Sequence, residues 1–455
     1  MKDWTLLRMV ILVVCLWGGC SYERAGVASL EQRVPRCEKS IALTFPADSN
    51  EPVFSVEPTG VVTLHQAISF ALMHNPELHA YYLEIRAAEA RRLQAGLRPN
   101  PEIGIEVENF GGSGAMTAVD SAETTIQLGQ LIELSGKRVK RRRLADIEKD
   151  LVRWDYESKR WDVYADVARA FVTVLAAQEN LARQEEIVAV SEQMEAAVAS
   201  RVEAGKDPAL ERTKAEVALA KTRIGRRQIT EKLKSARQQL AATWGCTEVR
   251  FEKVAGEFDR VSFPPPQTEV VKMLSRNPQI ARLNDEIEAR HRVLTLEKAK
   301  AVPDPVLFGG MRYLAEDSDS AFVFSLGIPI PLFDRNQGGI MEAGYELAKA
   351  RKHRKAVQTE VHALLLEAYQ RLSATYDEVT ALKSQVLPGA RSAFDSAREG
   401  YGEGKFDYLS VLDAQRTLFD TQTQYIEALL SYHMARIDLE RLTIQPIEPS
   451  ERMRD

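Results

Sequence analysis

Residues 98–108 read RPNPEIGIEVE, and this stretch decides the fold. Its two prolines stop the helix-like sequence that precedes it. Ile103, Ile105 and Val107 then alternate with glycine and glutamate. A period of two is typical of a strand with one apolar and one polar face. We therefore predict a strand over residues 101–109.

The same alternation returns three times further along the chain. Strands are predicted at residues 122–131, after a glycine-containing loop, and at residues 305–314 and 321–330, around a short acidic loop. The four strands form two hairpins that share one apolar set of side chains: Ile103, Ile105, Val107, Ile126, Leu128, Phe322, Phe324 and Leu326.

The hairpins belong to an internal duplication. Asn75-Pro76 returns as Asn277-Pro278, and Gly205-Lys206 returns as Gly404-Lys405. The offsets are 202 and 199 residues, too long for a solenoid repeat. We predict a first repeat at 61–250, a proline-containing linker at 251–268, a second repeat at 269–443 and a tail at 444–455.

Each repeat also contains long helical segments. Helices are expected at 64–74 and 77–98, and residues 137–204 and 335–403 read as two very long helices that return as helices 208–245 and 406–443. Heptad spacing predicts coiled-coil packing, and Pro388 should bend the second long helix. The heptad lines run through Val167, Val174, Leu181 and Val188, and through Leu366, Leu387, Phe394 and Tyr401, the second interrupted by Ser373 and Thr380.

A four-stranded sheet with an apolar face cannot close on itself. Membrane strands survive only in closed barrels, of which the smallest have about eight strands. Two, three or four copies would supply 8, 12 or 16 strands, and periodicity does not choose among them. The apolar set would face lipid and the glutamates a water-filled lumen. The third strand fits least well, because Leu307, Gly309 and Met311 would make its inner face less polar.

The N-terminus reads as an export signal. Residues 9–17 are an apolar run too short to span a bilayer, so residues 1–19 are expected to be a signal peptide, followed by a periplasmic segment at 20–60. Cys20 follows two glycines, as in a bacterial lipoprotein, although ordinary cleavage with Cys20 as a bystander is the alternative. Cys37 and Cys246 could pair in an oxidising periplasm or remain separate thiols. No transmembrane helix is expected in the mature chain.

Composition excludes several classes of function. The formal charge of −5 gives no case for nucleic-acid binding. The seven histidines are scattered and no Cys or Met cluster is present, so neither a tight metal site nor a cofactor is expected. No catalytic motif is recognisable, which speaks against an enzyme. Six basic residues in 137–143 either lie beside phosphate headgroups at the membrane surface or simply solvate a helix start.

The chain resembles the TolC-like outer membrane factor family over nearly all of residues 61–443. Residues 94–102 (QAGLRPNPE), 108–112 (ENFGG) and 130–138 (QLIELSGKR) resemble its heavy-metal branch, of cobalt–zinc–cadmium and copper–silver type. The resemblance implies a mixed α+β membrane protein, mostly helical, whose trimer forms a 12-stranded barrel continued by a periplasmic helical barrel. It also implies a periplasmic adaptor and an inner-membrane pump of the resistance-nodulation-division class as partners.

Two candidate sites follow from the resemblance. The family carries an acidic pair beyond the second-repeat turn, at a narrow periplasmic aperture. This chain keeps half of the pair, with Ser410 and Asp413 at those positions. The helix turns are candidate adaptor-docking points, although they could be helix reversals and nothing more: Gly205, Lys206 and Asp207, and Gly404, Lys405, Phe406 and Asp407.

Two other functions remain open from the residues alone. A related duct for drugs or secreted proteins would have the same architecture, because the partner pump would select the cargo. A non-conducting periplasmic coiled-coil lipoprotein would explain the heptads and Cys20, but it would not explain amphipathic hairpins at matching places in both halves.

Overall fold

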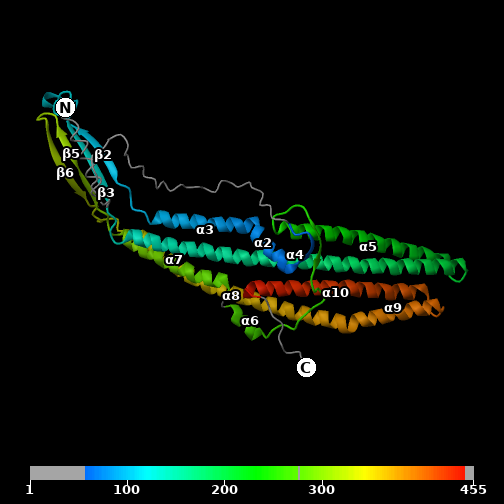
Figure 1. The fold of residues 1–455 in the computed structure, drawn as a ribbon. Coiled ribbons are helices and arrows are strands. Elements are labelled where there is room, and N and C mark those ends of the chain that lie inside the picture. Colours follow the sequence, from blue (N-terminus) through cyan, green and yellow to red (C-terminus); the bar gives the residue numbers. More distant parts are fainter. Residues whose placement is uncertain (1–56, 275–276, 446–455) are drawn as a thin grey trace, which may run out of the picture. The chain divides into compact units, whose positions relative to one another are not determined.

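The computed structural model describes residues 57–274 and 277–445, within the compact unit Glu57–Asp455. The expected signal peptide, Cys20, Cys37 and residues 446–455 of the tail lie outside the described residues. Figure 1 labels the elements along the chain.

The first repeat contains helices, a hairpin and two long antiparallel helices. Its elements are β1 (Gly60–Thr63), α2 (Leu64–His74), α3 (Pro76–Ala95), β2 (Glu102–Glu108), the 3₁₀ turn Gly114–Met116, β3 (Glu123–Leu131), α4 (Lys137–Glu203) and α5 (Ala209–Ala242). The 67 residues of α4 contain neither proline nor glycine, and the helix is about 100 Å long at its ordinary rise.

The second repeat follows the same order. After β4 (Phe251–Ala255) its elements are α6 (Gln267–Met273), α7 (Pro278–Lys300), β5 (Val306–Leu314), β6 (Asp319–Gly327), α8 (Gln337–Ala381), the π-helix Leu382–Val386, α9 (Leu387–Gly402) and α10 (Tyr408–Thr443). In residues 57–274 and 277–445, no helix is both long enough and apolar enough to cross a bilayer.

The repeated Asn-Pro pair has the same structural role in both halves. Asn75 caps α3 by accepting a hydrogen bond from the Leu78 amide at 2.8 Å, and its Nδ2 donates to the Thr243 carbonyl at 2.7 Å. Asn277 likewise caps α7, and its Nδ2 donates to the Leu442 carbonyl at 3.0 Å. Each asparagine therefore starts one helix and holds it to the end of the returning helix of its own repeat.

A second, two-stranded sheet was not expected from the sequence. β1 pairs with β4 in parallel, and Val62, Phe251 and Val254 are buried in the main core. The segment 251–268 therefore begins as a strand and is not only a linker. Strands of four and five residues carry too few alternations to be recognised by period.

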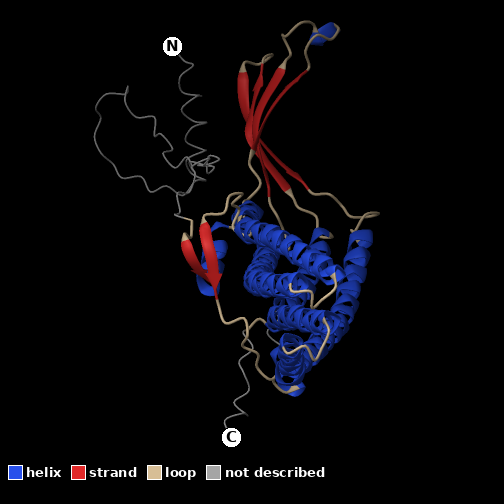
Figure 2. Ribbon diagram, turned by 90° about the vertical axis from the view of Figure 1, so that its right-hand side faces the viewer, coloured by secondary structure: helices blue, strands red, loops and turns tan. Residues whose placement is uncertain are grey.

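The main sheet joins the two hairpins in the order β2-β3-β5-β6, all antiparallel. Figure 2 shows its strands beyond one end of the helices, whereas the small β1–β4 sheet lies beside the helices. β6 begins two residues before the predicted strand and ends three residues earlier. Pro329 and Pro331 explain the early end, because proline cannot donate to a ladder.

The predicted heptad line of the second long helix is wrong by one residue over its first part. The residues that α8 buries on this line lie one position before Leu366, Ser373 and Thr380: they are Leu365, Leu372 and Val379. Beyond the π-helix the predicted line holds, since Phe394 and Tyr401 are buried.

The π-helix Leu382–Val386 produces this shift. A π turn inserts one residue into an α-helix, so the step from Val379 to Leu387 is eight residues, not seven. Pro388 lies two residues after the end of the π-helix. It has no N–H to donate, and its ring would clash with the Ser384 carbonyl in a regular α-helix. The bend expected at Pro388 thus takes the form of a π-bulge.

Candidate functional site

One face of the main sheet carries all eight predicted apolar residues. Directly opposed residues of antiparallel strands share a face. The register places Ile105 opposite Ile126, Ile126 opposite Met311, and Met311 opposite Phe322. These side chains are open to the surroundings of the single chain, with Ile105 69% and Phe322 79% exposed. Such an extended apolar surface indicates contact with lipid or another apolar partner.

The prediction for the third strand is wrong in its direction. Met311 and Gly309 lie in rows with Ile126 and Leu128, and Leu307 pairs with Leu326, so all three residues belong to the apolar face. The polar face of β5 instead carries Phe308, Gly310 and Arg312. The register with β3 decides this, because a shift of one residue would reverse every side chain.

The opposite face is acidic. Glu102, Glu106, Glu108 and Glu123 lie there, with Asp319 at the end of β6. Its one described cation, Arg312, forms ion pairs with Glu108 at 3.0 Å and with Glu123 at 2.6 Å. Arg312 is thus already paired with two carboxylates. Glu102 and Glu106 therefore have no basic partner among the described residues of the sheet.

The sheet is open at both edges within one chain. β2 and β6 each pair on one side only. Unpaired backbone groups inside hydrocarbon cost several kcal/mol each, so a membrane sheet of this kind requires neighbouring copies.

The two helix turns have the same backbone geometry. Gly205 and Gly404 adopt the left-handed conformation, with φ of 68° and 76°. In both turns the following lysine donates its amide hydrogen to a carbonyl five residues back, at 2.9 Å for Lys206 and 2.8 Å for Lys405. This is a Schellman motif, which glycine permits at no steric cost. The Phe406 ring fills the space over Gly400.

A polar cluster links the two turns across the repeats. The Arg201 guanidinium forms hydrogen bonds with both Asp207 oxygens, at 2.9 and 3.2 Å. The Tyr401 hydroxyl donates to Asp207 at 2.6 Å, and Arg201 stacks over the Tyr401 ring. Hydrogen bonds from Arg201 and then from Tyr401 lower the pKa of Asp207. Burial, followed by the hydrogen bond to Asp207, raises the pKa of Tyr401. The turn position of Asp207 was evident from the sequence, but its hydrogen bond with Tyr401, 194 positions away, was not.

The expected aperture residues have different roles in the chain. Ser410 belongs to the cap of α10, where its amide and hydroxyl both donate to Asp407, at 3.0 and 2.5 Å. The Asp413 side chain is exposed and has no ion-pair partner within the described part of the chain. The Asp413 carboxylate is therefore free to contact solvent or a neighbouring copy, whereas Ser410 is hydrogen-bonded to Asp407.

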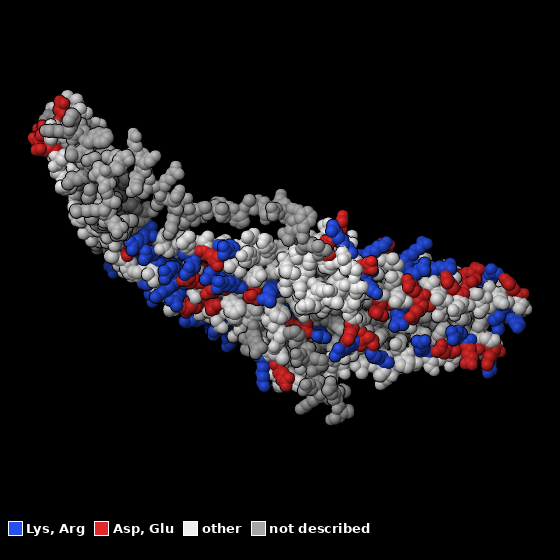
Figure 3. Space-filling model, in the orientation of Figure 1, with Lys and Arg blue, Asp and Glu red and all other residues white. Residues whose placement is uncertain are grey.

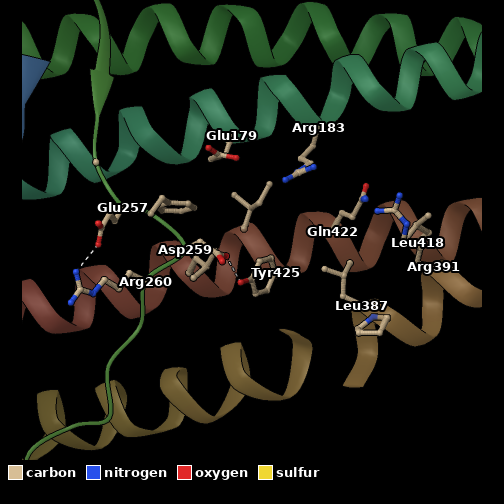
Figure 4. A pocket seen from close by; sticks show the side chains of 15 residues that line it. Glu179, Arg183, Glu257, Asp259, Arg260, Leu387, Arg391, Leu418, Gln422 and Tyr425 are labelled. Carbon is tan, nitrogen blue, oxygen red and sulfur yellow. Dashed lines mark hydrogen bonds and ion pairs between the residues drawn. The ribbon is translucent and has the colours of Figure 1, made fainter. Parts of the chain in front are cut away.

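A groove of about 810 Å³ lies beside the π-helix (Figure 4). Asp259 lies at its centre, where it accepts hydrogen bonds from Tyr425 and, at 2.5 Å, from Lys383. Burial alone would raise the pKa of Asp259, but the bonds from Lys383 and Tyr425 lower it below its ordinary value. Of the charged lining residues, Arg260 pairs with Glu257 at 2.8 Å, and Arg183 pairs with Glu186 outside the lining.

Two of the histidines, His74 and His433, contact backbone carbonyls. His74 lies 2.8 Å from the Phe70 carbonyl, and His433 lies 2.8 Å from the Phe258 carbonyl, where burial lowers its pKa. Residues 57–274 and 277–445 hold no group of three or more metal-ligating side chains. Cys246 lies beside Glu57, and burial followed by this carboxylate raises the pKa of its thiol to about 11. Its proposed pairing with Cys37 stays a prediction.

Comparison with known proteins decides the family. The family model for outer membrane efflux proteins matches residues 67–246 and 270–443, which fall within the two predicted repeats. The chain belongs to the outer membrane efflux protein family. The resemblance expected from the sequence motifs is thereby confirmed.

Individual relatives agree with this family. The cobalt-zinc-cadmium resistance protein CzcC of Cupriavidus metallidurans is 32% identical, over 89% of this chain and 95% of the relative. The nickel-cobalt-cadmium resistance protein NccC of Alcaligenes xylosoxydans xylosoxydans is 26% identical, over 70% and 71%. A solved structure of CusC has a TM-score of 0.72 at 19% identity, covering 85% of this chain and 93% of that chain, and it shows the shared fold.

Outer membrane efflux proteins are channels of the outer membrane, and the predicted localisation is confirmed. Members of the family form trimers and act in tripartite pumps as passive ducts. Three copies of the four-stranded sheet correspond to the 12 strands expected from the resemblance.

Proposed function

We propose that this outer membrane efflux protein is the homotrimeric, non-catalytic exit duct of a tripartite pump for heavy-metal cations. A periplasmic adaptor and an inner-membrane transporter of the resistance-nodulation-division class would complete the pump. The observation that carries the proposal is the two-faced sheet: an exposed apolar face backs onto a face with four glutamates and a single, fully paired arginine. An acidic lumen concentrates cations and repels anions. The metal-resistance names of CzcC and NccC support the same cargo.

Growth and metal content test this function in one strain. The chain would be expressed with a metal-resistance pump and adaptor in a host that lacks its own duct. We expect growth in cobalt, zinc or cadmium and a lower cell content of that metal, measured by mass spectrometry. Restored resistance to an organic drug with no change in metal content would contradict the proposed cargo and favour a drug duct.

We also propose that Cys20 is lipidated, from its place after Gly18-Gly19 at the end of the signal segment. Radiolabelled palmitate should enter the wild-type protein and not the Cys20→Ser variant. Label that persists in the variant would contradict lipidation at this residue.

Asp413 is proposed to line the periplasmic aperture. In a trimer it would recur three times around the axis, and Asp413→Asn should lower the cation-to-anion permeability ratio in planar bilayers by roughly twofold or more. Asp420→Asn is the matched control, because Asp420 is also exposed on α10 and lies two turns further from the tip. Equal effects of the two substitutions, or none from Asp413→Asn, would place the constriction elsewhere.

The Arg201–Asp207–Tyr401 cluster is proposed to hold the two tips together. Tyr401→Phe removes a hydrogen bond to a carboxylate, which is worth about 1.5–3 kcal/mol, and should speed proteolysis at the two turns without dissociating the trimer. Tyr408→Phe is the control, since Tyr408 is buried next to Tyr401, with ring centroids 6.0 Å apart, and its hydroxyl makes no hydrogen bond within the described part of the chain. Equal protease sensitivity in both variants would show that the cluster contributes nothing beyond packing.

The same cluster sets a pH dependence. The folded pKa of Asp207 is lowered, so its contribution to tip stability is present above the unfolded value of about 3.9. It is lost as the pH falls through the folded value. Protease resistance of the turns should therefore persist at pH 5 and fall only below about pH 4. A loss of resistance already at pH 6 would identify another group as the titrating one.

A further inference from the structure

Charge is segregated along the length of the hairpins. Between residues 99 and 136 every charged side chain is acidic, and between residues 305 and 334 Arg312 is the sole basic one. The helical ends that receive these strands are rich in lysine and arginine. Figure 3 shows basic side chains gathered over the nearby parts of the helices and acidic ones at the far end of the sheet.

The basic run at the start of α4 has two kinds of member. Lys137 is buried, and its Nζ lies 2.8 Å from Asp304 and 2.5 Å from the Val302 carbonyl. Arg141 pairs with Glu133. These two cations fasten the start of α4 to the adjoining connections, so they neither solvate the helix start nor remain available to a ligand.

Six other cations at this level have no carboxylate partner among the described residues. They lie either in the connections α3–β2 and β6–α8 or in the helix turns of α4 and α7 next to the sheet. Within the described residues, none of this set lies within 4 Å of a carboxylate; we call it the basic collar: Arg98, Arg138, Arg142, Arg143, Lys298 and Arg335. Five of the six are exposed, and Arg138 is half-buried. Unpaired cations in this number repel one another unless an anion lies among them.

An apolar segment borders the basic collar. Between β6 and α8, Ile330 is 75%, Leu332 64% and Phe333 91% exposed. Ile132 and Leu134, between β3 and α4, are also exposed. Apolar side chains next to basic ones are typical of the boundary between acyl chains and headgroups.

We propose that the basic collar binds the phosphate headgroups of anionic phospholipids in the membrane leaflet that faces the helices. The apolar residues of the two connections lie among the acyl chains, and the arginines, whose guanidinium forks match phosphate oxygens, meet the headgroups. This inference rests on the proposed placement of the sheet in the membrane. It adds a lipid preference to that placement and sets the depth at which the barrel ends.

Lipid binding to the purified full-length trimer tests the proposal. Detergent-solubilised trimers would be titrated with short-chain phosphatidylglycerol or phosphatidylcholine, and bound lipid counted by native mass spectrometry. We expect wild-type trimers to prefer phosphatidylglycerol. Since each basic residue near a lipid surface is worth roughly fivefold in affinity, the variant Arg138→Gln/Arg142→Gln/Arg143→Gln should lose tenfold or more of this preference.

A matched variant controls for charge. Arg226→Gln/Arg227→Gln/Lys232→Gln makes the same charge change at exposed positions of α5, and it should keep the wild-type preference. If the collar variant does not assemble, the single substitutions Arg142→Gln and Arg143→Gln should each lower the preference by roughly fivefold. Wild-type trimers without a preference, or a collar variant indistinguishable from the α5 variant, would overturn the proposal. Metal efflux measured in cells would remain in either case, so this failure is distinguishable from failure of the proposed function.

Discussion

Ile105→Arg should abolish most of the assembled trimer, whereas Glu106→Arg should leave it intact. Ile105 lies at the midpoint of β2 and belongs to the apolar row Ile105–Ile126–Met311–Phe322 that crosses the sheet. An arginine facing mid-bilayer lipid costs about 2–4 kcal/mol, and a trimer contains three copies. Glu106 lies on the acidic face, where a water-filled lumen would solvate the new side chain. Trimer yield in outer membranes, followed by native gel electrophoresis, measures the difference.

The two variants distinguish position in the sheet from charge, because Glu106→Arg changes the charge by more than Ile105→Arg does. A protein sensitive to charge alone would suffer more from it than from Ile105→Arg. Cysteine labelling checks the geometry directly, in a background where Cys37 and Cys246 are replaced by serine. Glu106→Cys should react with a water-soluble maleimide, and Ile105→Cys with a lipid-soluble reagent only. Equal labelling of both positions from water would disprove the assignment of the sheet to the membrane.

Gly404→Trp should reduce metal efflux to the level of a strain without the duct, while trimers still form in the membrane. The turn is proposed to dock the adaptor, and the two turns of three chains offer six such points. A Cβ at Gly404 would meet no atom within 4 Å, so the added ring projects outward from the tip. The backbone cost of a side chain in the left-handed conformation is about 1–2 kcal/mol, which is small beside the stability of a trimer.

Gly404→Asn separates docking from folding. Asparagine tolerates the left-handed conformation, so this variant keeps the turn and adds little bulk. We expect it to retain most of the efflux activity. Gly205→Trp should act like Gly404→Trp if both turns dock the adaptor. Loss of the trimer in Gly404→Trp would assign the turn to folding, and full metal resistance in that variant would contradict docking at this point.

Local sequence patterns were sufficient to predict much of the architecture. Ile103, Ile105 and Val107 revealed a two-faced strand because strand side chains alternate with a period of two. The Asn-Pro and Gly-Lys pairs marked helix starts and turns because capping and left-handed glycine are local requirements. The internal repeat was recognisable for the same reason, because equivalent helix starts and turns in the two halves use the same residue types.

Other features depended on partners distant in the chain. The face on which Met311 lies follows from pairing with Ile126, and one residue of slip would reverse it. The π-bulge shifts the buried heptad positions of α8 by one residue relative to those of α9. Pro388 predicted a bend here but not this shift. Likewise, Asp207 acquires its role only when Tyr401 is folded against it. Residue type and period thus determined which of the longer elements form, because those depend on neighbours in sequence. Only the tertiary structure decided register and polar pairing, because these arise between segments that the chain brings together from about 200 residues apart.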